Sequence, residues 1–98
     1  MIVEFAQAAE EDLEAIGDYI ARDNPVRALS FLRELRSACL DLRSMPKRFP
    51  FLSGFEHLGI RRRLHGNYLI FYRVDSKRVI ILHILHGASD YTALVFSG

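Results

Sequence analysis

The pair Asn24-Pro25 constrains the fold of this chain more than any other feature of the sequence. Asparagine is a strong helix N-cap, and proline is tolerated at the first helical position because the N–H that it lacks would be unpaired there. Apolar residues recur at helical spacing both before and after this pair. The sequence therefore predicts two amphipathic helices with almost no linker between them, which is a helical hairpin.

The two helices are bounded by their apolar stripes and by proline. The first is expected from about Ala9 to near Asp23, and its stripe consists of Ala9, Leu13, Ile16 and Ile20. The second is expected to begin at Pro25 and to end at Met45-Pro46. Its stripe consists of Ala28, Phe31, Leu32, Leu35, Cys39 and Leu42. Because Cys39 falls on this stripe, we expect it to be an inert core thiol.

The rest of the chain has the composition of β-strands. The expected strands are 2–5, 60–65, 68–74 and 79–85, with a tight turn at Gly66-Asn67. The last two strands are apolar on both faces, which is typical of interior strands. The order β-α-α-β-β-β predicts a single α+β domain over residues 1–98, with the helical hairpin packed on one face of a mainly antiparallel sheet.

Residues 46–58 are predicted to form a loop that is unusually rich in large apolar side chains. It contains two prolines, a glycine and the three phenylalanines Phe49, Phe51 and Phe55. We expect these rings to plug the end of the core. The alternative is an exposed patch that binds a partner.

Composition excludes several classes of protein. The chain has 98 residues, of which 50% are hydrophobic and 26% charged, and this balance is typical of a globular domain. A single cysteine forms no internal disulfide. No apolar run reaches the length of a membrane helix, and the acidic N-terminus does not resemble a signal peptide. We therefore expect a cytoplasmic protein that does not bind membranes.

The charge is divided along the chain. Residues 1–24 contain seven acids and one base, a net charge of −6, whereas residues 25–98 contain five acids and twelve bases, a net charge of +7. The simplest interpretation is that both regions only face solvent. The alternative is that the acidic and the basic region take part in binding other molecules.

The densest basic run is Arg61-Arg62-Arg63, on a predicted strand. Side chains alternate along a strand, so Arg61 and Arg63 share one face and Arg62 takes the other. Arg73 and Arg78, in or near the neighbouring strands, extend the positive surface. This arrangement favours contact with nucleic acid or an acidic partner. The alternative is an edge strand that is charged to prevent aggregation.

The four histidines do not predict a metal site, and no cofactor motif is present. His83 and His86 are three residues apart on one predicted strand, so they point to opposite faces. His57, His65 and His83 are expected to be structural. His86 precedes Gly87 at the end of the last strand, where it is a candidate general acid or base.

The ordered set of segments resembles the ParE toxins of the RelE/ParE superfamily over nearly the whole chain. The matching segments are Asp12-Leu13, Ile16, Tyr19-Ile20-Ala21, Asp23-Asn24-Pro25, Ala28, Met45-Pro46, Phe49-Pro50, Gly59-Ile60-Arg61, 67–74 (NYLIFYRV) and 84–91 (ILHGASDY). The resemblance implies the toxin of a type II toxin–antitoxin module with the β-α-α-β-β-β fold. ParE toxins block DNA gyrase, whereas their RelE-type relatives cut mRNA in the ribosomal A site.

The resemblance also implies partners. A ParD-like antitoxin neutralises the toxin, and the antitoxin's N-terminal part binds operator DNA, so that the toxin reaches DNA only indirectly. Because the helical hairpin covers one face of the sheet, we expect the other face to stay open for an antitoxin helix or strand. Acidic antitoxin residues are expected to meet the arginines. The candidate residues for binding the antitoxin or the target are Arg61, Arg62, Arg63, Arg73, Arg78, Tyr91 and Phe96.

A RelE-type toxin would be an enzyme, with bases that hold the scissile phosphate and an acid or base that moves the proton. Its candidate catalytic residues are Arg63, Arg73, His86 and Tyr91. The loop at 46–58 contains only Lys47 and Arg48, without the lysine-rich stretch of a strong RelE match. The resemblance to ParE toxins therefore implies a toxin that binds gyrase and has no covalent chemistry of its own.

Overall fold

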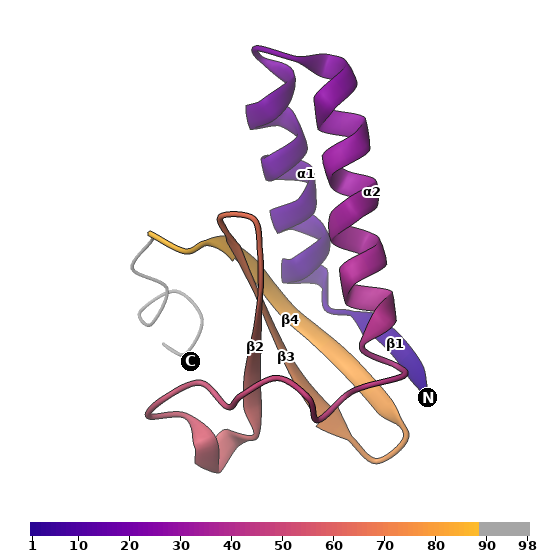
Figure 1. Cartoon of the computed structure of the whole chain (residues 1–98), viewed down its shortest axis with the longest axis vertical. Coiled ribbons are helices and arrows are strands. Elements are labelled where there is room, and N and C mark those ends of the chain that lie inside the picture. Colours follow the sequence, from indigo (N-terminus) through magenta and orange to yellow (C-terminus); the bar gives the residue numbers. More distant parts are fainter. Residues whose placement is uncertain (89–98) are drawn as a thin grey trace.

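The computed structural model describes residues 1–88 and has two helices on one face of a four-stranded sheet (Figure 1). The elements are β1 (Ile2–Phe5), α1 (Gln7–Ala21), α2 (Pro25–Asp41), the short 3-10 helix η1 (Glu56–Leu58), β2 (Ile60–His65), β3 (Tyr68–Asp75) and β4 (Arg78–His86). The predicted α+β order is confirmed. Two of the predicted site residues, Tyr91 and Phe96, lie outside the described residues.

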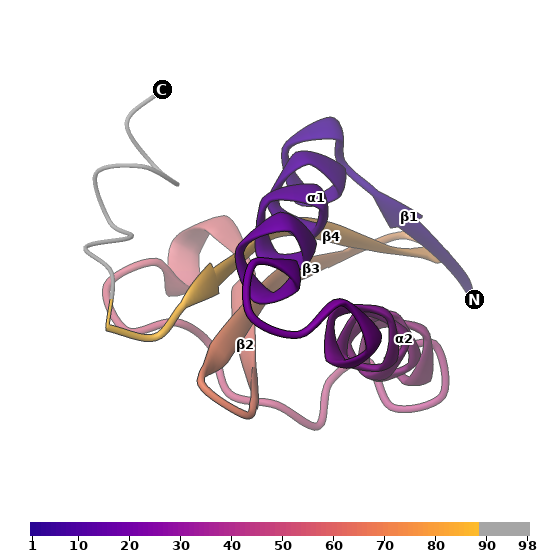
Figure 2. The same cartoon turned by 90° about the horizontal axis from the view of Figure 1, so that it is seen from above.

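The helical hairpin forms as the sequence predicts. The Asn24 side chain accepts a hydrogen bond of 3.0 Å from the backbone N–H of Arg27, and Pro25 opens α2. The helices lie side by side on the sheet (Figure 2). α1 ends at Ala21, near the expected Asp23, whereas α2 ends at Asp41, sooner than expected, and residues 42–44 form a turn.

The sheet order is β1-β4-β3-β2, so the two most apolar strands are interior, as predicted. β1 pairs with β4 in parallel, and the other pairs are antiparallel. Between β3 and β4 the register shifts, since Phe71 is opposite His83 while Tyr72 is opposite Ile81. Leu82 is therefore an extra residue, which makes a β-bulge in β4.

The face of the sheet opposite the helices is partly covered by the chain itself, which corrects the expectation of an open face. The core between the sheet and the helices contains Leu13, Leu35, Ile70, Tyr72, Ile81 and others. On the opposite face, Leu52 from the loop is buried against Ile60, Leu69 and Phe71. The chain's own loop thus covers part of the face that we expected to remain free for a partner.

The phenylalanines of this loop divide between the two cores. Phe49 packs against the helix-side core and Phe55 against the opposite cluster, so two of the three rings plug the core as predicted. Phe51 is exposed, and its ring lies 3.9 Å from the guanidinium of Arg61.

Two polar side chains of the helix-side core, Tyr72 and Cys39, are buried without carrying a charge. The hydroxyl of the buried Tyr72 donates a hydrogen bond of 2.9 Å to the backbone oxygen of Pro46, and burial raises the pKa of this phenol. Cys39 is fully buried, and burial raises the pKa of its thiol to about 12. The thiol is therefore inert near neutral pH, as its place on the apolar stripe predicts.

Candidate functional site

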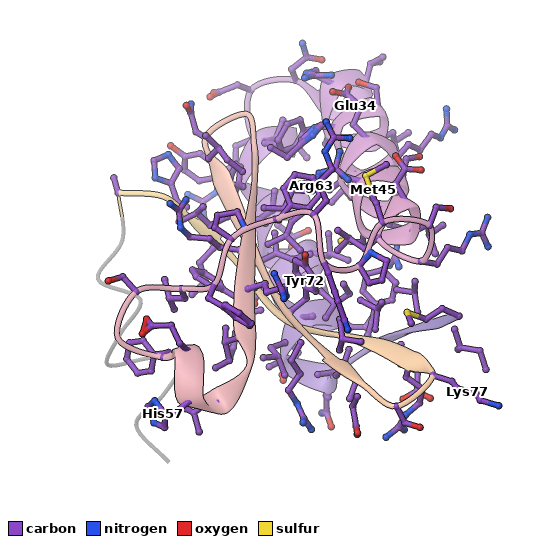
Figure 3. All side chains as sticks on the ribbon, turned by 60° about the horizontal axis from the view of Figure 1, so that its bottom comes forward. Glu34, Met45, His57, Arg63, Tyr72 and Lys77 are labelled. Carbon is purple, nitrogen blue, oxygen red and sulfur yellow. The ribbon has the colours of Figure 1, made fainter. Side chains whose placement is uncertain are left out.

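The arginine triplet on β2 alternates between the two faces of the sheet, as predicted. Arg61 and Arg63 lie on the helix side, where Figure 3 shows Arg63 beside α2. The Arg61 guanidinium donates hydrogen bonds to the backbone oxygens of Phe49, at 2.7 Å, and Lys47, at 3.2 Å. It thereby fastens the loop after α2 to the sheet.

Arg63 caps the end of α2. The N–H of Leu42, which would bond to Ala38 in a continuing helix, instead bonds to Cys39, and the Ala38 oxygen accepts a hydrogen bond of 2.7 Å from Arg63. A positive charge is favourable at a helix C-terminus. The same guanidinium lies 4.9 Å from the centre of the Phe49 ring. Arg63 is half-buried, and its contacts join β2 to the end of α2 and to the loop that follows α2.

The remaining predicted arginines lie elsewhere. Arg62 and Arg73 are exposed on the face opposite the helices, on the neighbouring strands β2 and β3. Arg78, at the start of β4, forms ion pairs with Glu4 at 3.1 Å and Asp75 at 3.0 Å, and these carboxylates raise the pKa of its guanidinium. The five arginines therefore do not form one continuous surface.

The structure also separates the candidate catalytic residues that it describes. Arg63 is on the helix side, Arg73 is on the opposite face, and His86 is at the end of β4. His86 accepts a hydrogen bond of 3.1 Å at Nδ1 from the N–H of Ala88, and its ring meets Tyr68 edge-on at 5.3 Å. No shared phosphate site joins Arg63, Arg73 and His86.

A groove of about 680 Å³ lies where the helical hairpin and the turn between β2 and β3 approach each other. We call it the turn-end groove, and it is lined by Tyr19, Ile20, Arg27, Phe31, Asn67, Tyr68 and His86. Phe31 and Tyr68 are 5.5 Å apart between ring centres, and burial raises the pKa of the Tyr68 phenol. The size and the aromatic walls are suited to an apolar side chain or a planar ring. Of the predicted site residues, His86 alone lines this groove within residues 1–88.

Two histidines have structural partners, as expected. Nε2 of His65 lies 3.7 Å from Glu34, and Nδ1 of His83 lies 2.8 Å from Oδ2 of Asp12. The same oxygen of Asp12 accepts a hydrogen bond of 2.9 Å from the N–H of Ile84, so it ties α1 to β4 beside the bulge. His57 differs from the expectation, because it is exposed on η1 (Figure 3).

Sequence reasoning assigned no contact to Asp12, since an acid near a helix start is favourable without a side-chain partner. Its partner is 71 residues away in sequence, and no local pattern predicts the contact. Within residues 1–88, no group of three or more histidine, cysteine or acidic side chains is placed to hold a metal ion. None of the described helices is long and apolar enough to cross a membrane.

A family model agrees with this architecture. The model for the ParE toxin of type II toxin–antitoxin systems, parDE, matches residues 3–91. The chain belongs to this family. The toxin has no match among curated protein sequences.

Solved structures share the fold of the toxin. One is described as the chromosomal ParDE toxin–antitoxin system from P. aeruginosa, with a TM-score of 0.77 and 22% identity over 88% of this chain and 95% of that one. Another is the toxin–antitoxin complex RelBE2 from Mycobacterium tuberculosis, with a TM-score of 0.66 and 27% identity over 87% of this chain and 95% of that one. The fold is therefore that of both the ParE and the RelE branches.

Proposed function

We propose that this ParE-family toxin inhibits DNA gyrase by binding to it, and that a ParD-like antitoxin neutralises it in the cytoplasm. The observation that carries the proposal is the match of the ParE family model to residues 3–91. The order of elements and the fold of the P. aeruginosa ParDE structure support it.

The placement of the arginines favours binding over catalysis. Cleavage of RNA needs cations at the scissile phosphate and an acid or base within hydrogen-bond reach of the reacting oxygens. Arg61 and Arg63 instead donate to backbone oxygens, and Arg73 lies on the opposite face from Arg63. These arginines hold the fold together or face away from His86.

Ribosome-dependent mRNA cleavage is the second candidate function. The similarity to the RelBE2 complex favours it, as does the position of His86 beside Tyr68 in the turn-end groove. Tyr68 offers a ring for a base to stack on, and Arg27 at the other wall offers a positive charge. Arg27 is, however, engaged by Glu34, which weakens its attraction for a phosphate.

An antitoxin partner is supported by the two solved structures, both of which are toxin–antitoxin systems. We propose that the toxin contacts operator DNA only through the antitoxin.

Two assays test the function. Purified toxin is added to a gyrase supercoiling reaction and, separately, to translating ribosomes with labelled mRNA. Loss of supercoiling with intact mRNA is the expected result. Cleaved mRNA with normal supercoiling would replace the proposal by the RelE-type function, and the absence of both effects would contradict both.

A further inference from the structure

The turn-end groove is walled by aromatic side chains from the helical hairpin and from the end of the sheet. The Tyr68 ring lies 5.5 Å from the Phe31 ring and 5.3 Å from the His86 ring, between ring centres. Tyr19, which α1 contributes to the lining, is 65% exposed. An apolar side chain that enters a groove of this kind is favoured, because apolar surface on both partners is removed from water.

The described part of the chain ends beside this groove. The N–H of Gly87 donates a hydrogen bond of 2.7 Å to the Asn67 oxygen, and a Cβ at residue 87 would lie 3.3 Å from that oxygen. The N–H of Ala88 then donates a hydrogen bond of 3.1 Å to Nδ1 of His86. A bond from the backbone to a side chain two residues earlier bends the chain toward that side chain. Because the His86 ring lines the groove, residue 88 lies at the groove wall.

The sequence that follows residue 88 is first polar and then apolar. Residues 89–92 (SDYT) precede residues 93–96 (ALVF), and both stretches lie outside the described residues. We call residues 93–96 the apolar run. The match to the ParE family model ends at residue 91, so this model assigns no role to the apolar run. Contact with an apolar surface is favourable for such side chains, because it removes them from water.

The apolar run is long enough to reach the far side of the groove. An extended chain spans at most about 3.3–3.6 Å per residue, so residues 89–94 reach as far as about 20 Å from Ala88. The Phe31 ring is only two ring-to-ring steps, of 5.3 and 5.5 Å, from the His86 ring at which the described chain ends. The polar residues 89–92 therefore suffice as a connection, and the apolar run falls at the groove.

We propose that the apolar run folds back into the turn-end groove of its own chain, where Phe96 packs against the rings of Phe31 and Tyr68. This goes beyond the proposed function and does not depend on it. Phe96 gains an intramolecular contact in place of the partner contact that the sequence predicts. A filled groove leaves no free ring on which an RNA base can stack, so the same contact disfavours the second candidate function.

The test uses tryptophan fluorescence of the full-length toxin. The chain contains no tryptophan, so Phe96→Trp places a single reporter in the apolar run. Quenching by acrylamide is measured for this protein alone and in combination with Tyr19→Glu or Leu64→Glu. Tyr19 lines the groove, whereas Leu64 lies on the opposite face of the sheet, and their exposures of 65% and 62% make them a matched pair. Circular dichroism verifies that each protein is folded.

We expect the tryptophan to be quenched at least about threefold less in the folded protein than in urea, since grooves of this kind bury about 70–90% of what they bind. Tyr19→Glu is expected to bring quenching to within about twofold of the value in urea, because it places a charge beside the apolar run. Leu64→Glu is expected to leave the protection unchanged. A tryptophan that is quenched freely in Phe96→Trp, protection that survives Tyr19→Glu, or protection that only Leu64→Glu removes would each overturn the proposal.

Two further measurements complete the test without gyrase or antitoxin, so its outcome is independent of the proposed function. Dilution is expected to leave the protection unchanged, and protection lost on dilution would show that the apolar run of a second copy fills the groove, which overturns the proposal. In the unmodified toxin, proton NMR is expected to show contacts between the apolar run and the rings of Phe31 and Tyr68. A folded toxin without these contacts would overturn the proposal, whatever the larger tryptophan does.

Discussion

Arg63→Met tests whether the half-buried arginine of β2 stabilises the fold. Methionine keeps most of the aliphatic stem, but it removes the donor to the Ala38 oxygen at the end of α2 and the cation beside the Phe49 ring. A hydrogen bond from a charged group contributes about 1.5–3 kcal/mol, and a cation–π contact about 0.5–1 kcal/mol at an exposed site. Because Arg63 is only half-buried, water replaces part of the lost bond, and we expect a loss of about 2 kcal/mol.

Arg62→Met is the matched control, since it removes the same charge one residue away. Arg62 is exposed on the opposite face, and such substitutions usually change stability by no more than about 0.5 kcal/mol. For a domain of this length, 2 kcal/mol lowers Tm by about 8–16 °C. The measurement is thermal and urea unfolding of both variants, followed by far-UV circular dichroism.

Equal stabilities of the two variants would refute the structural role of Arg63. A variant Arg63→Met that keeps its Tm but loses the antitoxin would instead support the arginine surface that the sequence predicts. The experiment therefore separates an arginine that stabilises the fold from one that binds a partner, at the position where the two interpretations differ most.

Three further predictions concern contacts that hold the fold. Asp12→Ala is expected to destabilise the chain by about 1–3 kcal/mol in urea unfolding, because it leaves the Ile84 N–H unpaired, whereas Asp12→Asn keeps an acceptor and loses less. Asn24→Ala is expected to cost about 1 kcal/mol through the lost cap, and an unchanged urea midpoint would contradict this. Cys39 is expected to react with a thiol reagent at pH 8 at least about a hundredfold more slowly in the native protein than in urea. Equal rates of reaction in the native protein and in urea would contradict the burial of Cys39. Because burial raises the pKa of this thiol in the folded state, its contribution to stability is complete below about pH 8.5 and is lost as the pH rises toward 12.

The hairpin and the interior position of the two most apolar strands follow from the local sequence pattern. Asn24-Pro25 sets the start of α2 through a cap that involves neighbours only, and the apolar strands are interior because both of their faces are covered. The alternation of the triplet on β2 also follows from strand geometry. These features are predictable because residues close in sequence decide them.

The environment of each arginine did not follow from the same rules. The face of Arg63 was predictable, but its acceptor at Ala38 depends on where α2 ends, 25 residues earlier. The cover on the opposite face comes from Leu52, whose loop folds back along β2 through a bridge between Phe51 and Arg61. Asp12 and His83 are joined across nearly the whole described chain. Long-range contacts of this kind leave no spacing pattern in a single sequence.

Titration of gyrase with the purified toxin tests the central claim, which is that this ParE-family protein acts by binding. The account predicts that supercoiling falls in proportion to the gyrase bound, is abolished when binding saturates, and returns when the operon's second protein is added. Undiminished supercoiling at saturating toxin, or no detectable binding to gyrase, would contradict it.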